Sequence, residues 1–305
     1  MIQEKHIENA IREMFENLTF TQEPAGLYDP LRYMINIGGK RIRPRLCLTA
    51  YALFKDDFSE EVLSPAAAIE VFHSFTLIHD DIMDKADVRR GVPTVYRKWD
   101  ENTAILSGDV MSIESYKLIA KAPAVALPQV LELFSKTAAE VCEGQQYDMD
   151  FEAKSKVSVE EYTRMIELKT SVLLSGSAMI GATLAGARED DIKRIYRFAT
   201  ELGLAFQLQD DMLDSYGDEA LGKKIGGDIL EGKQTFLMVQ AMSRATEEER
   251  EVLRTTHLSD KLSDAEKIAT VKALYDKLEV KRATEQQIDQ RFERALGILD
   301  SLSIG

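Results

Sequence analysis

The segment VFHSFTLIHDDIMD spans residues 71–84 and joins an apolar stretch to three aspartates. The apolar positions between Phe72 and Ile78 carry the periodicity of a helix. On a helix, residues four apart lie on one face, whereas the next residue lies about 100° around the axis. Asp80 and Asp84 should therefore point the same way. Like charges at this spacing destabilise a helix by about 0.2–0.5 kcal/mol, so a bound cation would relieve them.

A second aspartate cluster, Asp210-Asp211-Met212-Leu213-Asp214, ends another apolar stretch 130 residues later. Unpaired carboxylates are costly to desolvate at the end of such a stretch. Magnesium resolves this cost, since it takes one or two carboxylates, keeps waters and binds substrate phosphates. One cluster alone could be a solvated acidic helix end, but two copies favour metal binding. A calcium EF-hand is excluded because its loop spacing and glycine are missing.

Helical periodicity recurs almost throughout the chain, and Gly and Pro together make up only about 8% of its 305 residues, below the usual share of about 12%. No low-complexity linker divides the sequence, which favours one all-α domain over residues 1–305. Helices are expected near residues 4–17, 28–36, 64–84, 100–121, 126–150, 158–185, 189–215, 232–243, 247–255 and 261–302.

The overall charge is acidic, with a formal net charge of −14 and a pI of about 4.9. Such a surface repels polyanions, so we expect no binding of nucleic acid. No stretch approaches the roughly 18 uncharged apolar residues of a membrane span, and no signal-peptide block is evident. We therefore expect a cytoplasmic protein without a membrane span. Cys47 and Cys142 lack metal-ligand spacing, and both thiols are expected to be buried in a reducing compartment.

Basic residues gather at a few places in this acidic chain. Residues 40–45 contain four cations within six residues, Arg89-Arg90-Gly91 follows the first aspartate cluster, and further lysines lie at 169, 223, 224 and 233. Arginine forks bind diphosphate oxygens in a bidentate manner, and lysine supplies a point charge. Each cation alone could be a solvated surface charge, but the pattern favours an anion site.

Several motifs together resemble those of the trans-isoprenyl diphosphate synthases. They occur in family order over roughly residues 38–235, and their combination is specific. The motifs are GGKRIRP (38–44), HSFTLIHDDIMD (73–84), RRG (89–91), GQ (144–145), LKT (168–170), FQLQDDMLD (206–214), LGK (221–223) and GK (232–233).

This resemblance implies a helical bundle around a deep central cavity and a homodimer. It also implies three Mg²⁺ ions per active site, with Asp80 and Asp84 on one side and Asp210 on the other. Asp81, Asp211 and Asp214 would be second-tier ligands or orienting groups. The resemblance assigns the allylic diphosphate to Arg89, Lys169, Lys223 and Lys233, and the diphosphate of isopentenyl diphosphate to Lys40, Arg43, His73 and Arg90.

The implied reaction condenses isopentenyl diphosphate with an allylic diphosphate (dimethylallyl, geranyl or farnesyl). The Lys169 carbonyl, the Thr170 hydroxyl and the Gln207 amide would stabilise the allylic cation, although packing within helices is the alternative role. Two other functions compete: a terpene cyclase, and a catalytically silent regulatory subunit of a heteromeric synthase. Both intact aspartate clusters argue against these alternatives.

Product length depends on the residues that lie below the first cluster. A helix rises about 1.5 Å per residue, so Thr76 lies roughly 6 Å and Phe72 roughly 12 Å from Asp80 along the cavity wall. In the resembled family, aromatic residues here form the floor for the growing chain. Phe75 beside a small Thr76, without an insertion in the motif, favours geranylgeranyl over farnesyl diphosphate. A core-packing role for either phenylalanine stays open.

Overall fold

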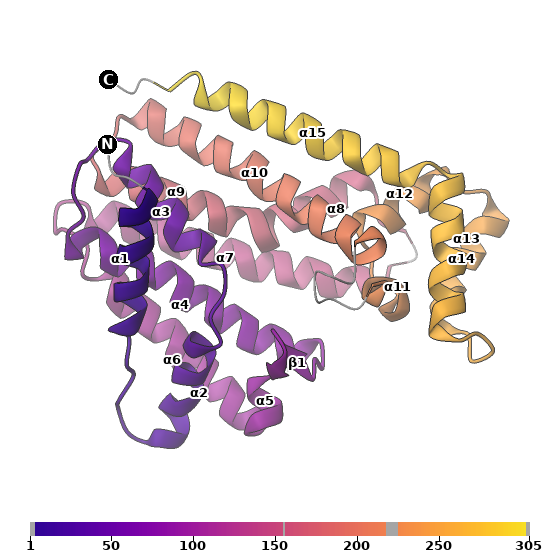
Figure 1. Cartoon of the computed structure of the whole chain (residues 1–305), viewed down its shortest axis with the longest axis horizontal. Coiled ribbons are helices and arrows are strands. Elements are labelled where there is room, and N and C mark those ends of the chain that lie inside the picture. The colour runs from indigo at the N-terminus through magenta and orange to yellow at the C-terminus, as the bar shows by residue number, and fades with distance from the viewer. Residues whose placement is uncertain (1–3, 155, 218–224, 303–305) are drawn as a thin grey trace. The chain divides into compact units, whose positions relative to one another are not determined.

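The computed structural model describes residues 4–154, 156–217 and 225–302, and it confirms the all-α class (Figure 1). These residues group into two compact units. Unit 1 is formed by residues up to 138 with 173–196, and unit 2 by residues 139–172 with 197–301. Helices α7 (Leu127–Glu152) and α10 (Glu189–Tyr216) contribute residues to both. A single domain over the whole chain stays a prediction.

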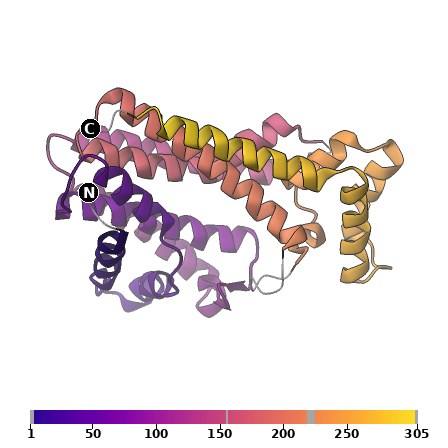
Figure 2. The ribbon, with the colours of Figure 1, turned by 45° about the horizontal axis from the view of Figure 1, so that its top comes forward.

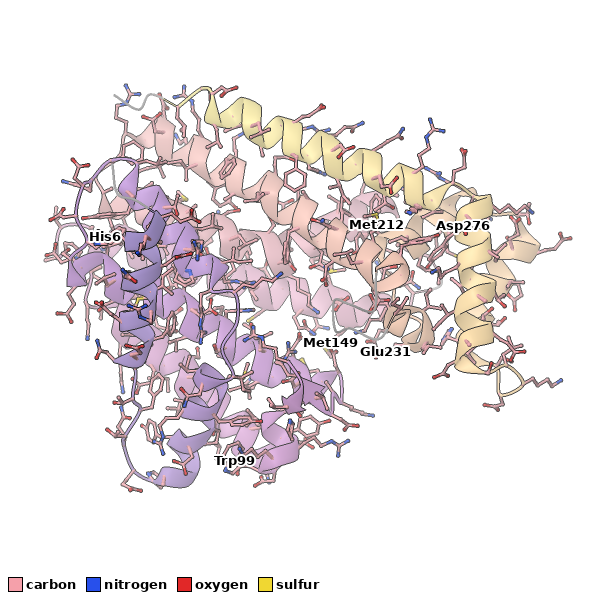
Figure 3. The ribbon with its side chains drawn as sticks, in the orientation of Figure 1. His6, Trp99, Met149, Met212, Glu231 and Asp276 are labelled. Atoms are coloured by element: carbon pink, nitrogen blue, oxygen red, sulfur yellow. The ribbon has the colours of Figure 1, made fainter. Side chains whose placement is uncertain are left out.

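Unit 1 is built around one central helix, α4 (Glu60–Met83), which contacts α1, α2, α3, α5 and α6. Among the described residues of unit 1, the regular extended structure is one short antiparallel hairpin. The other elements are α1 (Glu4–Glu16), α2 (Ala25–Asn36), α3 (Ile42–Ala52), β1 (Val88–Arg89), β2 (Val92–Pro93), α5 (Val95–Lys98) and α6 (Glu101–Ile119). Trp99, labelled in Figure 3, directly follows α5.

Helix α4 is central because small and apolar residues cover most of its surface, as in other fully buried helices. Val71 and Ile78 pack with Leu31 and Met34 of α2 and with Met111 of α6. The helix begins at Glu60, four residues before the expected start, because the acidic residues at 60 and 61 suit a helix N-terminus. Among the described residues it is the one helix whose length and composition would allow a membrane crossing, but 67% of that window is buried inside the fold.

Unit 2 contains the later helices. Helix α15 runs beside α10 within unit 2 (Figures 1 and 2), where Arg291 donates to Glu201 at 2.9 Å. The elements of unit 2 are α8 (Val159–Ile166), η1 (Glu167–Ser171), α11 (Gly227–Glu231), α12 (Phe236–Arg244), α13 (Glu247–Thr255), η3 (Thr256–Leu258), α14 (Asp264–Lys277) and α15 (Val280–Leu299). Helix α9 (Val172–Leu184) lies almost entirely in unit 1.

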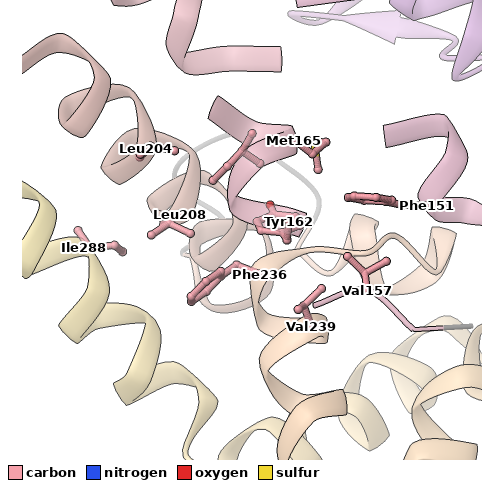
Figure 4. Packing of buried hydrophobic residues seen from close by; sticks show 10 residues of the cluster. Phe151, Val157, Tyr162, Met165, Leu204, Leu208, Phe236, Val239 and Ile288 are labelled. Carbon is pink, nitrogen blue, oxygen red and sulfur yellow. The ribbon is translucent and has the colours of Figure 1, made fainter. Parts of the chain in front are cut away.

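A buried cluster joins five helices of unit 2 (Figure 4). Tyr162 of α8, Leu204 and Leu208 of α10 and Phe236 of α12 belong to it, together with Phe151 of α7 and Ile288 of α15. At the end of α10, the Tyr216 hydroxyl donates to Asp276 of α14 at 2.7 Å (Asp276 is labelled in Figure 3). These contacts fix the helix that carries the second aspartate cluster.

Three expectations from the sequence need correction. The predicted helix 261–302 is interrupted because Glu279 adopts a left-handed conformation with φ 54°. The predicted helix 232–243 starts at Phe236, after Gly232 has ended α11. Cys47 is buried, which raises the pKa of its thiol to about 12, but Cys142 is exposed. Helical periodicity does not report such breaks, since neither a lone left-handed residue nor an exposed thiol alters the apolar pattern.

Candidate functional site

The first aspartate cluster forms the last turn of α4, and its second member points away from the other two. Asp81 is only 1% exposed and pairs with Arg89, whose Nη2 lies 2.7 Å from Oδ1. Arg89 Nε also donates to both carboxylate oxygens, at 2.9 and 3.0 Å. Burial raises the pKa of Asp81, and the guanidinium opposes that rise. Asp81 thus anchors Arg89, while Asp80 and Asp84 share the other face.

A tight hairpin brings Arg89 back to α4. Arg90 and Gly91 form its two-residue loop with φ of 52° and 81°, the pattern of a type I′ turn. The turn also directs Arg90 toward Gly39. A Cβ on Gly39 would lie 2.6 Å from Arg90 Nη1, so the guanidinium lies directly against the glycine backbone. The motifs GGKRIRP and RRG therefore meet in unit 1.

A buried carboxylate that the sequence analysis missed holds this cationic loop in place. Glu70 of α4 is 3% exposed and accepts a hydrogen bond of 3.0 Å from Arg41. Burial lowers the pKa of Arg43 and of Arg90, and the negative charge of Glu70 opposes this decrease. A charge inside the apolar run AAAIEVF is the signal that could have revealed it, because buried charges require partners.

His73 lies one helical turn beyond Glu70, within the same group of cations. Burial lowers its pKa well below the usual 6.5, and Arg43, Arg90, Arg89 and Arg41 lower it further. The imidazole is therefore neutral near pH 7 and offers a hydrogen bond rather than a charge. The structure thus brings together four of the predicted binding residues, and Lys40 is exposed on the adjoining loop.

The second aspartate cluster repeats the arrangement of the first. Asp211 is 4% exposed and accepts hydrogen bonds from the Phe236 backbone at 2.8 Å, from Gln207 Nε2 at 3.0 Å and from the Tyr162 hydroxyl. Burial raises its pKa to about 6. Of the two roles left open for Asp211, ligand or orienting group, this geometry supports the second.

The last aspartate of this cluster contacts α11. Asp214 accepts a hydrogen bond of 3.1 Å from the backbone of Asp228. Burial first, and then the charge of Asp214, raise the pKa of Asp228 to about 7. Lys233 lies 2.9 Å from Glu231 and 4.0 Å from Asp228. The predicted Lys223 lies outside the described residues.

Lys169 and Thr170 lie in a π-helical turn, η1, where the sequence predicts an uninterrupted helix. The backbone of Val172 donates to Glu167, five residues earlier. Such turns occur frequently at functional sites. Two glycines allow neighbouring helices to approach: a Cβ on Gly144 would lie 2.2 Å from Lys169 N, and one on Gly203 would lie 2.5 Å from Ser171 Oγ.

Both predicted polar side chains of η1 have partners in unit 2. Lys169 Nζ lies 2.6 Å from Asp148, and the Thr170 hydroxyl donates to Gln207 Oε1 at 3.0 Å. Asp148 was not predicted, although it lies four residues after Gly144 and hence on the same face of α7. Tyr162 was also missed, because nothing local distinguishes a tyrosine with a polar partner from one that only packs.

Two of the three predicted chain-length residues, Phe72 and Phe75, belong to a group of aromatic rings in unit 1. Phe72 is 2% exposed, and its ring centroid lies 5.2 Å from that of Phe75 and 5.5 Å from that of Phe134. Phe75 also meets the ring of His79 at 4.8 Å. The Thr76 hydroxyl donates to the His73 carbonyl at 2.8 Å. Phe72 is thus part of the core, and Phe75 is its half-buried neighbour.

Carboxylates paired at the ends of helices, together with clustered arginines and lysines, define an all-α protein suited to diphosphates and a divalent cation. Residues 24–278 match the polyprenyl synthetase family, and the chain belongs to that family. It is a trans-prenyltransferase. The expectation taken from the motifs is therefore confirmed at the level of family, fold class and reaction.

Similar proteins support the same assignment. A geranylfarnesyl diphosphate synthase of Natronomonas pharaonis is 39% identical, over 93% of this chain and 89% of its own. A geranylgeranyl diphosphate synthase of Methanosarcina mazei is 40% identical, over 78% of this chain and 73% of its own. A crystal structure of a geranylgeranyl pyrophosphate synthetase from Pyrococcus horikoshii has a TM-score of 0.90 at 33% identity, covering 99% of this chain and 91% of that one.

The family generally uses Mg²⁺, and the donor set fits that ion. Each cluster offers two carboxylates on one helix face, and magnesium takes one or two from a protein. Within residues 4–154, 156–217 and 225–302, no three His, Cys, Asp or Glu side chains gather closely enough to hold a metal by themselves. Most ligands would then come from water and substrate phosphates.

Proposed function

We propose that the protein condenses isopentenyl diphosphate with dimethylallyl, geranyl or farnesyl diphosphate, and that geranylgeranyl diphosphate is its main product. One observation carries this proposal. In both aspartate clusters the second carboxylate is buried and hydrogen-bonded, to Arg89 in the first and to three donors in the second. The carboxylates at the first and fifth positions of each cluster are then left to orient toward metal ions.

The metal ions would be held by Asp80 and Asp84 from one cluster and by Asp210 from the other, with Asp214 in a supporting position. Three Mg²⁺ ions per site are proposed on the family resemblance. When bound, Mg²⁺ neutralises the charge that develops on the departing diphosphate. Asp81 and Asp211 act as orienting groups.

The cations divide between two diphosphates. We assign Arg89, Lys169, Lys223 and Lys233 to the allylic diphosphate, and Lys40, Arg43, His73 and Arg90 to isopentenyl diphosphate. The neutral His73 donates a hydrogen bond, whereas the guanidinium of Arg43 supplies charge. Asp148 holds Lys169 by an ion pair and competes with the diphosphate for it.

The reaction begins when the allylic C–O bond breaks and its electron pair leaves with the diphosphate. The double bond of isopentenyl diphosphate attacks the allylic cation, and loss of a proton to the released diphosphate gives the trans product. The oxygens of Thr170, Gln207 and the Lys169 carbonyl stabilise the cation, because their dipoles are already oriented before it forms.

The product assignment rests on the aromatic group below Asp80. Thr76 is small, and its hydroxyl is turned to the His73 carbonyl. The next aromatic barrier is Phe75, supported by the buried Phe72 roughly 12 Å from Asp80. One similar protein is named for the proposed geranylgeranyl product, and another is named for the longer geranylfarnesyl product.

We further propose that the enzyme is a cytoplasmic homodimer. Leu106 and Ile113 of α6 are 57% and 55% exposed, lie on one face of that helix, and are flanked by Ile105. Contiguous exposed apolar side chains of this kind mark protein interfaces. Sedimentation of the wild type and of Leu106→Glu tests the proposal: the wild type should be a dimer and the variant a monomer, and a monomeric wild type would overturn it.

Incubation with isopentenyl and farnesyl diphosphates plus Mg²⁺ tests the activity, with chromatography of the products. We expect geranylgeranyl diphosphate. A cyclase would release hydrocarbon without consuming isopentenyl diphosphate, and a silent subunit would convert neither. Asp80→Ala and Asp210→Ala should lower turnover by orders of magnitude and leave the helix content intact. Asp289→Ala, an exposed aspartate of α15, is the matched control and should retain full activity.

A further inference from the structure

Four side chains and one backbone N–H of unit 2 form a continuous chain of hydrogen bonds. The Tyr162 hydroxyl and the Phe236 backbone donate to Oδ2 of Asp211, the latter at 2.8 Å. Gln207 Nε2 donates to Oδ1 of the same carboxylate at 3.0 Å. The Thr170 hydroxyl then donates to Gln207 Oε1 at 3.0 Å. The chain connects the buried cluster in Figure 4, which labels Tyr162 and Phe236, to the π-helical turn.

The chemistry of these groups allows only one direction for the chain. An ionised Asp211 has no proton to donate, so both of its oxygens accept. Gln207 must therefore turn its NH₂ toward Asp211 and its oxygen toward Thr170. A hydroxyl has one proton, and that of Thr170 is committed to Gln207. On its remaining sides Thr170 Oγ1 presents lone pairs.

This direction determines the sign of the local dipoles. With the Gln207 amide reversed, its NH₂ would donate to Thr170, and the hydroxyl proton would turn outward. A cation would then meet the positive ends of both groups. In the observed arrangement two oxygens, Thr170 Oγ1 and Gln207 Oε1, lie 3.0 Å apart and concentrate negative potential.

On the basis of the proposed function, we propose that Tyr162 and Asp211 are positioning residues that orient Gln207 and Thr170 so that the allylic cation meets oxygen lone pairs. Asp211 acts here through Gln207, and Tyr162 acts through Asp211. The buried surroundings of Asp211 keep this orientation fixed before substrate arrives. Dipoles that need no reorganisation are the ones that stabilise a developing charge most effectively.

Asp211→Asn tests the proposal without a change in shape. The Phe236 N–H can only donate, so it takes the single amide oxygen of the new asparagine, and the asparagine NH₂ then faces Gln207. Gln207 must flip, which reverses the dipoles at Thr170. With farnesyl and isopentenyl diphosphates as probes, we expect kcat to fall by about 10²-fold. Both KM values and the Mg²⁺ concentration for half-maximal activity should stay near those of the wild type.

A rise in that Mg²⁺ concentration would identify Asp211 as a metal ligand and overturn the proposal, as would an unchanged kcat. A double-mutant cycle with Thr170→Val adds a second criterion. Once the hydroxyl is removed, Asp211→Asn should cost clearly less than it costs in the wild type. Full additivity would refute the coupling.

Tyr162→Phe should lower kcat by a smaller factor than Asp211→Asn, since two other donors remain on the carboxylate. The matched control is Tyr275→Phe, which removes another buried hydroxyl of unit 2. It should leave kcat unchanged, and an equal loss in both variants would reduce Tyr162 to a structural residue. Failure of the proposed function would appear differently, as a wild-type protein that forms no prenyl product.

Discussion

Replacement of Gly144 by alanine is expected to displace the π-helical turn that carries Lys169 and Thr170. The new Cβ would lie 2.2 Å from Lys169 N and 2.6 Å from both Leu168 C and Lys169 Cα. Ordinary contacts between such atoms are about 3.5–4.0 Å, so α7 and η1 must separate by roughly 1.3 Å or more. All three atoms are backbone, which cannot move aside as the end of a side chain does.

The energetic outcome is the difference of two effects. Alanine in place of glycine stabilises a helix by about 0.5–1 kcal/mol. Overpacking costs about 1–3 kcal/mol, and contact with backbone favours the upper end. We expect a net loss of about 2 kcal/mol. A displacement of about 1 Å near the reacting groups should also lower kcat by about 10²-fold.

Thermal unfolding and steady-state kinetics measure both effects. Gly297→Ala in α15 is the matched control, because nothing lies within 4 Å of its added Cβ. The control should be slightly more stable than the wild type and fully active. If Gly144→Ala were equally stable and active, the close approach of α7 to η1 and its role in positioning Lys169 would both be refuted.

Four further predictions concern three residues of unit 1. His73→Gln should retain the KM for isopentenyl diphosphate, because one neutral hydrogen-bond donor replaces another. His73→Lys should change this KM. A strong change in the KM of the wild type between pH 6.5 and 8 would contradict the neutral state of His73. The pKa of His73 is depressed in the folded protein, so below about pH 6.5 the unfolded chain binds a proton that the folded protein does not. The unfolding free energy of the wild type, measured with denaturant, should therefore fall faster with decreasing pH than that of His73→Gln. Glu70→Gln leaves Arg41 with a weaker partner and should lower the unfolding free energy by up to about 3 kcal/mol. Replacing Arg41 by Met in the same variant should restore that free energy in denaturation experiments. Phe75→Ala should lengthen the product, whereas Phe292→Ala at an exposed site should not; identical chromatograms would exclude Phe75 as the floor.

Several features were predictable because they depend on residues close in sequence. The shared face of Asp80 and Asp84 follows from the helix repeat alone, and the grouping of cations at 40–45 is visible in the chain. The helical class follows from apolar periodicity together with few glycines and prolines. These properties are local, so a single sequence is sufficient to derive them.

Tertiary structure decided which partner each polar group has. Asp81 meets Arg89 because a type I′ hairpin reverses the chain, and Asp211 meets Tyr162 across 49 residues. The same holds for the turn η1, whose path depends on the close approach of Gly144 from another helix. Helical spacing relates residues that lie within a turn or two of one another. Contacts between distant segments are selected by burial, since a buried carboxylate is stable only where the fold supplies its donors.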